Sequence, residues 1–408
     1  MLSTNTLQLF NTLRTFGVIE SGLHRLSYSP AYLEAQHYLI SEMESIGMTT
    51  SIDGFGNLIG IYKGSDSSLK PILVGSHLDT VPSGGSYDGA LGIVTALGIL
   101  KTWHEEGYIP PRSVHLVAFA EEEGITFGEI CLGSRYLCGE LNDTNLYEFI
   151  DGTGKTLHSY LKEKVCETPT LVVNDSVADR YHSFTELHIE QGPVLESKNL
   201  EIGIVRSIVG IIRFQVTIEG IANHAGTTPM SLRQDALCAA SKIITMVHEK
   251  ALASNGEYVA TVGKLSLFPN AANVVPGRTD FIVEYRSEHQ ELLDCALPEQ
   301  IHTLLEMVAT EYNVRINATK TAQIPSIPMN TAAIHKLEQL ATTNSLSHLT
   351  MPSGAGHDAM IIGKYIPTVM LFVPSKDGIS HNPKEFTSWE AIEKGLLLLE
   401  AYLKEEAK

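Results

Sequence analysis

Cysteine is scarce in this chain of 408 residues, which contains only five. The five are widely spaced, odd in number and without a CxxC pair: Cys131, Cys138, Cys166, Cys238 and Cys295. Such a pattern argues against a disulfide framework and favours reduced thiols. We therefore expect a cytoplasmic protein.

Positive charge is also scarce. Lys and Arg together number 29 against 47 Asp and Glu, which gives a formal net charge of −18. Binding to nucleic acid depends on Lys and Arg that neutralise phosphates, and attraction to an anionic membrane surface depends on the same side chains. The sequence therefore predicts neither a nucleic-acid partner nor a membrane partner.

Long hydrophobic runs are absent as well. No segment approaches the ~18 consecutive apolar residues of a transmembrane helix. The first twenty residues lack the basic start and apolar centre of a signal peptide, and they are typical of an amphipathic helix. We expect no membrane span.

The composition that remains is that of a globular protein, with 43% hydrophobic and 19% charged residues. At ~100–200 residues per domain, the length predicts two or three domains. Residues 209–323 show the order strand, helix, strand, strand, helix, strand, which is typical of a ferredoxin-like α+β domain. We expect this domain to be inserted into a discontinuous α/β domain, residues 1–208 and 324–408, with a mixed sheet and helices on both faces.

Local signals place several elements of the larger domain. Ser29 and Pro30 suit the start of a helix and Gly47 its end. A second helix is expected over 91–103, and buried strands over 113–120, 185–189 and 367–373. The last helix has a capping-box start, Thr387 to Glu390.

Polar clusters follow these buried strands. His77, Asp79 and Asp88 follow an apolar run, Glu121–Glu123 follow the strand 113–120, His188 lies on the strand 185–189, and His381 follows the last strand. In open α/β sheets, ligands bind beyond the carboxyl ends of the strands. We expect these clusters to meet at one site.

Histidines and carboxylates in this combination favour a site for two divalent metal ions. Adjacent carboxylates repel one another, and a cation relieves the repulsion. Mixed imidazole and carboxylate ligation suits Zn²⁺, with Mn²⁺, Co²⁺ or Ni²⁺ as alternatives. Such a pair of ions lowers the pKa of a bound water and polarises a carbonyl. Each residue alone has a simpler interpretation, such as a structural histidine, a solvated acidic turn or a helix N-cap, but these do not explain why all four clusters follow buried strands.

Seven segments together resemble the amidase, hydantoinase/carbamoylase family of dinuclear-metal, aminoacylase-like hydrolases. They are GSHLDTVPSGGSYDGALG, AEEEG, ELHIEQGPVLE, GIANHAGTTPM, NVVPG and the pair SGAGHDAM and GISHNP. The resemblance runs from about Arg25 to Trp389 in the family's order. One position departs from the family pattern, because Thr126 stands where many members have arginine, which leaves the local substrate contacts open.

The resemblance implies a role for each matched residue. Glu122 would act as general base and acid, with Asp79 orienting His77. The implied metal ligands are His77, Asp88 as the bridge, Glu123, His188 and His381. The implied substrate-binding residues are Gln191, His224, Asn273, Arg286 and Gly356, with His224 also donating to the carbonyl oxygen. On their own, Arg286 could be a surface ion pair, His224 could order a turn and Asn273 could cap one; His357 is placed near the site without a direct role.

The activity that the resemblance implies is hydrolysis of an N-carbamoyl-L-amino acid to the amino acid, CO₂ and ammonia. The alternatives are an allantoate amidohydrolase, then a β-ureidopropionase or another N-acyl amino-acid amidase. The expected partner is thus a small anionic ureido or N-acyl amino acid. A non-catalytic scaffold protein is the alternative from another class, although such a protein would be expected to lose ligands. The inserted domain is expected to serve as a lid and to form a homodimer.

Overall fold

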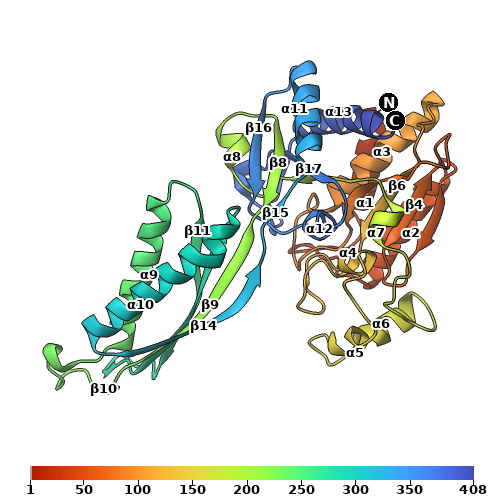
Figure 1. The fold of residues 1–408 in the computed structure, drawn as a ribbon. Coiled ribbons are helices and arrows are strands. Elements are labelled where there is room, and N and C mark those ends of the chain that lie inside the picture. Colours follow the sequence, from red (N-terminus) through yellow and green to blue (C-terminus); the bar gives the residue numbers. More distant parts are fainter. Residues whose placement is uncertain (1) are drawn as a thin grey trace. The chain divides into compact units, whose positions relative to one another are not determined.

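The computed structural model describes residues 2–408, and the chain folds into two compact units (Figure 1). The first unit comprises Met1–Arg206 and Met329–Lys408, and the second comprises Ser207–Pro328. Both chain ends belong to the first unit, where the Trp389 indole donates to the Ser3 hydroxyl at 2.9 Å. The five cysteines are free thiols.

The first unit is built on a mixed sheet with a parallel centre. The strand order is β15-β8-β17-β7-β5-β6-β4-β3, and β16 pairs with β8. Neighbouring strands among β17, β7, β5 and β6 run parallel, whereas β8 and β4 flank this centre in antiparallel pairing. The bounds are β3 Thr49–Ile52, β4 Leu58–Tyr62, β5 Ile72–His77, β6 Val114–Phe119, β7 Phe184–Ile189, β8 Ile202–Ile208, β15 Ile327–Pro328, β16 His348–Ser353 and β17 Thr368–Val373.

Helices cover both faces of this sheet, as expected. Leu187 on β7 faces Gly395 of α13, whereas the carboxylate of its neighbour Glu186 accepts the amide of Ala359 in α12 on the other face. Successive side chains of a strand point to opposite faces, so α13 and α12 lie on opposite sides. The longer helices are α1 Leu2–Leu13, α2 Pro30–Glu44, α3 Ala90–Glu106, α11 Thr331–Thr343 and α13 Trp389–Glu406; the shorter ones are α4 Leu132–Leu137, α5 Asn145–Glu148, α6 Leu157–Lys164, α7 Val177–Arg180, α8 Val194–Ser197 and α12 Asp358–Ile362.

The helix starts follow from local chemistry, with one correction. The Ser29 hydroxyl accepts the amide of Tyr32 and caps α2, as predicted. The capping-box prediction at Thr387 is wrong by one residue, because the hydroxyl of Ser388 accepts the amide of Ala391 instead. Two adjacent hydroxyl residues offer the same capping chemistry, so the sequence alone does not separate them. None of the helices within residues 2–408 is long and apolar enough to span a membrane.

The second unit has the expected strand and helix order. Its four-stranded sheet has the order β11-β13-β9-β14, and all three pairings are antiparallel. Helices α9 and α10 bury their apolar sides on one face, against side chains such as Phe281 and Tyr285. The bounds are β9 Gly210–Glu219, β10 Asn223–His224, α9 Ala236–Ala253, β11 Val259–Phe268, β12 Val274–Val275, β13 Arg278–Ser287, α10 Leu297–Tyr312 and β14 Arg315–Ile324.

A histidine in the central sheet makes the stability of the first unit depend on pH. His115 lies on β6, with its ring 5.4 Å from the ring of Tyr181, and burial lowers the pKa of His115 to about 4. An unfolded histidine has a pKa of about 6.5, so the unfolded chain binds more protons between these values. Stability is therefore complete above pH ~6.5 and falls as the pH drops toward 4.

We predict that His115→Gln reduces the acid sensitivity of unfolding by roughly 1–3 kcal/mol between pH 7 and pH 4.5. The measurement is the urea-unfolding midpoint across this range for wild type and variant. His37→Gln, at an exposed position of α2, serves as the matched control and should keep the wild-type slope. Equal slopes for His115→Gln and wild type would contradict the prediction.

Candidate metal centre

Four parallel strands deliver the polar clusters to one edge of the sheet. His77 is the last residue of β5, and the acidic triplet begins two residues after β6 ends at Phe119. His188 is the penultimate residue of β7, and His381 lies in the loop after β17. The carboxyl ends of parallel strands share an edge, so these side chains converge, as the sequence predicts.

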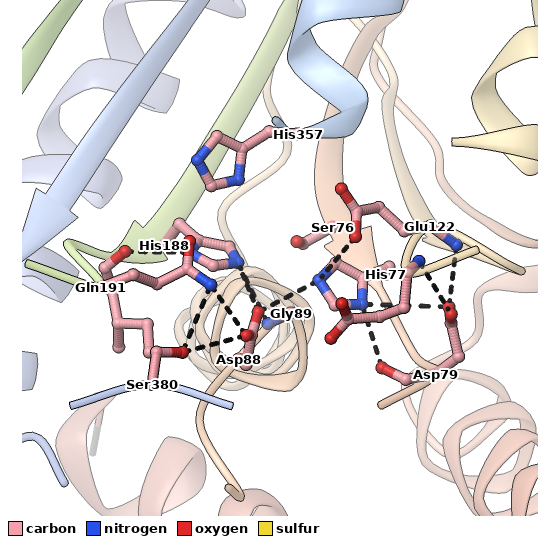
Figure 2. Close-up of polar contacts among 12 residues, drawn as sticks. Ser76, His77, Asp79, Asp88, Gly89, Glu122, His188, Gln191, His357 and Ser380 are labelled. Carbon is pink, nitrogen blue, oxygen red and sulfur yellow. Dashed lines mark hydrogen bonds and ion pairs between the residues drawn. The ribbon is translucent and has the colours of Figure 1, made fainter. Parts of the chain in front are cut away.

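Asp88 lies at the centre of the cluster (Figure 2). Its Oδ1 is 3.3 Å from Nε2 of His77 and 3.1 Å from Nε2 of His188, while its Oδ2 is 3.2 Å from Nε2 of His381. The next residue, Gly89, has φ of 64°, and a Cβ there would lie 2.5 Å from the His77 ring. Only glycine therefore lets the start of α3 approach the imidazole closely enough to present Asp88.

The backbone hydrogen bonds of His77 and His188 determine which ring nitrogen carries the proton and which one presents a lone pair to Asp88. Nδ1 of His77 is 3.0 Å from the carbonyl oxygen of Asp79, and Nδ1 of His188 is 2.9 Å from that of Ile189. A carbonyl can only accept, so both Nδ1 atoms carry the proton. The neutral rings then point two lone pairs at a carboxylate oxygen, an arrangement that is favourable only when a cation or additional protons lie between them.

The three glutamates of the acidic triplet make different contacts. Glu121, with φ of 58°, turns back, and its Oε1 accepts the amides of Thr126 at 2.7 Å and Phe127 at 3.1 Å, so it orders the following loop. Glu122 and Glu123 face the site, and their amides donate to the two carboxylate oxygens of Asp79, each at 3.2 Å. Asp79 thus holds the acidic loop with its carboxylate and contacts His77 with its carbonyl; its carboxylate is 3.8 Å from Nδ1 of His77.

The pKa values of the carboxylates in this cluster are strongly shifted. Burial raises the pKa of Glu122 well above its usual range, and burial together with Asp88 raises the pKa of Glu123 to about 7. Burial also opposes ionisation of Asp88, but once His77, His188 and His381 are protonated, their hydrogen bonds outweigh burial and hold the pKa of Asp88 well below its usual range. Several carboxylates crowded in a buried site are an arrangement that a bound cation stabilises.

The residues fit two metal ions that share one ligand. Among residues 2–408, His77, Asp88 and His188 form one group whose ligand atoms lie within 4.8 Å of one another, and Asp88, Glu123 and His381 form another. Oε1 of Glu123 is buried without a hydrogen-bond partner, which leaves it available to a cation. All five predicted ligands are therefore brought together, and their mixed imidazole and carboxylate chemistry suits divalent ions such as Zn²⁺.

Glu122 lies beside this pair of groups, with Oε2 3.8 Å from Nε2 of His77. Its Oε1 is 3.6 Å from the Cys131 thiol, a contact that no sequence motif signals. On the other side of Asp88, Nε2 of Gln191 donates to Oδ2 at 2.8 Å, and the hydroxyl of Ser380 lies 3.2 Å from the same atom (Figure 2). Ser380 was not a candidate from the sequence, and its position next to His381 was the only signal available.

The remaining predicted residues are divided between the two units. Gly356, in the first unit, precedes buried His357, and a Cβ at Gly356 would contact Met360 and Ile130. The other three, His224, Asn273 and Arg286, belong to the second unit.

Within the second unit, two of these residues are close together. The amide of Ala225, next to His224, donates to the carbonyl of Asn273 at 2.9 Å. Nδ1 of His224 accepts the amide of Gly226 at 3.0 Å, so the neutral ring carries its proton on Nε2. Arg286 lies on β13, where its Nε donates to the carboxylate of Glu284 at 2.8 Å.

A family model, two relatives of known name and a solved structure all relate this chain to peptidases and amidohydrolases. Residues 73–405 match the family model described as Peptidase family M20/M25/M40. The sequence is 38% identical over 387 residues to the allantoate amidohydrolase of Bacillus subtilis (93% of this chain, 92% of that one). It is 35% identical over 383 residues to the N-carbamoyl-L-amino-acid amidohydrolase of Paenarthrobacter aurescens (94% and 93%). The structure resembles a hydantoinase/carbamoylase family amidase from Burkholderia ambifaria with a TM-score of 0.93 at 27% identity, covering 100% of this chain and 98% of that one.

We predict that Asp88→Asn weakens Zn²⁺ binding at least ~100-fold, because it removes the charge common to both ligand groups, and even outer-shell changes cost roughly 10–100-fold. The measurement is isothermal titration of EDTA-treated protein with Zn²⁺. Asp175→Asn, at an exposed position, is the control and should bind as wild type does. Unchanged stoichiometry and affinity in Asp88→Asn would exclude Asp88 as a ligand.

Proposed function

The chain belongs to the peptidase family M20/M25/M40, among its amidohydrolases of the hydantoinase/carbamoylase type, and on this premise we propose that it hydrolyses the ureido C–N bond of an N-carbamoyl-L-amino acid. The products would be the L-amino acid, CO₂ and ammonia. The observation that carries the proposal is the pair of ligand groups that share Asp88, with the buried carboxylate of Glu122 beside them.

We propose two divalent metal ions at this centre, held by His77, Asp88 and His188 on one side and by Asp88, Glu123 and His381 on the other. When bound, they would lower the pKa of a water and polarise the scissile carbonyl. The Nδ1–H groups of His77 and His188 are held by backbone carbonyls, so the rings present Nε2 to the ions without reorganisation.

Glu122 would act as the general base and then as the general acid of the reaction. The residue is 7% exposed, and its carboxylate contacts a thiol and an imidazole. In that setting it can accept a proton from the attacking water and return it to the departing nitrogen. The backbone of the acidic loop, held by the Asp79 carboxylate, keeps Glu122 in place during both transfers.

Residues outside the metal centre would recognise the substrate. We propose that Arg286 binds the substrate carboxylate, since a guanidinium matches a carboxylate in a bidentate geometry. His224, whose Nε2 carries the proton, can donate to the carbonyl oxygen as negative charge develops there. Gln191, Asn273 and Gly356 complete the proposed substrate site, with the second unit acting as a lid in a homodimer.

Allantoate is the second candidate substrate. The relative from Bacillus subtilis is named allantoate amidohydrolase, and its 38% identity is no lower than the 35% of the N-carbamoyl-L-amino-acid amidohydrolase. Both reactions would attack a ureido carbon near a carboxylate, so the same centre could serve either. β-Ureidopropionase or other N-acyl amino-acid amidase activity ranks third.

We predict that the Zn²⁺- or Mn²⁺-loaded protein hydrolyses N-carbamoyl-L-amino acids with a higher kcat/KM than allantoate, N-carbamoyl-β-alanine or N-acetyl amino acids. Ammonia release measures the turnover of the ureido substrates, and release of the free amino acid measures that of the N-acetyl amino acids. Glu122→Gln should lower kcat by roughly 100- to 10,000-fold while metal content is retained, because it removes the proton carrier and spares the ligands. Glu129→Gln, in the same loop and exposed, should leave the rate unchanged. A higher kcat/KM for allantoate would shift the assignment to the second candidate, and near-wild-type turnover by Glu122→Gln would refute the mechanism.

We predict that Arg286→Ala raises KM for an N-carbamoyl amino acid roughly 10- to 100-fold, the effect of one lost charge-assisted hydrogen bond. The matched control is Arg278→Ala, because Arg278 lies on the same strand and also pairs with an acid two residues away, Asp280, at 2.8 Å. Steady-state kinetics with the free acid and with its neutral amide should show the effect only for the acid. Equal effects of the two arginine variants would contradict the proposal.

A further inference from the structure

Glu385 is a buried glutamate in the segment between β17 and α13, with 5% of its surface exposed. Its carboxylate accepts three hydrogen bonds. Oε1 accepts the amides of Tyr87 at 2.9 Å and Asp88 at 3.2 Å, and Oε2 accepts the Ser380 hydroxyl at 2.9 Å. A buried carboxylate is stable only when such donors replace water, so the location of these donors shows what Glu385 holds in place.

All three donors belong to the segments that carry the shared carboxylate and His381. The amides of Tyr87 and Asp88 lie just before α3, and the Asp88 side chain is common to both ligand groups. The Ser380 hydroxyl lies between Glu385 Oε2 and Asp88 Oδ2, at 2.9 and 3.2 Å. Glu385 thus connects two segments that are about 300 residues apart in sequence.

The His381 segment needs support from outside itself. His381 has φ of 54°, a conformation that non-glycine residues rarely adopt, and its side chain is 50% exposed. Of the five proposed ligands, His381 is therefore the one whose position depends least on packing. A fixed Ser380 immediately before it limits the conformations that this loop can adopt.

The chain also leaves room for Glu385. A Cβ on Gly85 would overlap the Glu385 carboxylate, so the absence of a side chain at Gly85 is what lets the carboxylate reach the two amides. Gly85 does not have a positive φ, so Gly85→Ala would displace Glu385 without imposing that backbone strain. The position of the carboxylate can therefore be changed without removing it.

We propose that Glu385 is a positioning residue of the metal centre, which sets the backbone of Asp88 and, through Ser380, the approach of His381. This inference rests on the two-ion centre proposed above. Glu385 is not itself a ligand, because it belongs to none of the metal-binding groups among residues 2–408 and both of its oxygens are occupied. Its effect on metal binding comes from restricting ligand positions before the ions arrive.

The test is isothermal titration of EDTA-treated, full-length protein with Zn²⁺. We expect Glu385→Ala to weaken binding at least ~10-fold, as other outer-shell losses do. Glu385→Gln should stay within about 3-fold of wild type, because its amide oxygen can accept both backbone amides and its amide nitrogen can donate to Ser380. Glu390→Ala removes an exposed glutamate five residues away and should behave as wild type does.

Two further readouts separate positioning from a loss of stability. The thermal unfolding temperature of the metal-free protein reports stability alone. At saturating Zn²⁺, Glu385→Ala should regain kcat with KM unchanged, since the reacting groups are intact. If Glu385→Ala does not fold, Gly85→Ala is the second variant, with the same expected direction of change in Zn²⁺ affinity.

Wild-type affinity in Glu385→Ala or in folded Gly85→Ala would overturn the inference, and so would a Glu385→Gln variant as weak as Glu385→Ala. These outcomes differ from failure of the proposed function. If the wild-type protein itself binds no Zn²⁺, the metal centre is wrong and the inference falls with it. If the wild-type protein binds Zn²⁺ and the variants bind it equally well, the metal centre stands and the inference alone is wrong.

Discussion

The Asp88 carboxylate is the interaction on which the site depends, because its two oxygens face three imidazoles from three different segments of the chain. Parallel β5 and β7 bring two of these rings to the same sheet edge, and the loop after β17 brings the third. Gly89 allows α3 to begin against the His77 ring, so that Asp88 projects between the histidines. Asp79 and Glu385 hold backbone amides of the segments that carry Glu122 and Asp88. Gln191 donates to the Asp88 carboxylate, and the Ser380 hydroxyl lies 3.2 Å from the same Asp88 oxygen.

The net charge of the protein and the charge of the proposed substrate have the same sign. The chain has a formal net charge of −18, yet the substrate that we propose is itself an anion, so attraction by the whole protein does not explain binding. On our proposal the sign is reversed locally, by two divalent cations at Asp88 and by the guanidinium of Arg286. Burial raises the pKa of Glu122 and of Glu123, so this centre disfavours negative charge on both carboxylates unless positive charge lies beside them. The overall acidity still argues against nucleic acid as a partner.

Much of the fold could be predicted because apolar strands and strand-end polar residues leave local patterns. The convergence of His77, Glu123 and His188 followed from parallel strands sharing an edge, and the start of α2 followed from Ser29 and Pro30. Contacts between distant segments leave no such pattern. Glu385 gave no signal, and Ser380 gave none beyond its position next to His381, because their partner Asp88 is about 300 residues away. The three glutamates Glu121–Glu123 look alike in sequence although one orders a loop. Which of Thr387 and Ser388 caps α13 depends on backbone geometry that both residues allow.

The central claim is that one carboxylate bridges two cations, and anomalous diffraction from crystals grown with Zn²⁺ tests it most directly. Data collected on both sides of the zinc absorption edge would locate the ions without reference to activity. The account predicts two peaks, one beside His77 and His188 and one beside Glu123 and His381, with a separate Asp88 oxygen facing each. A single peak, or peaks away from Asp88, would contradict it.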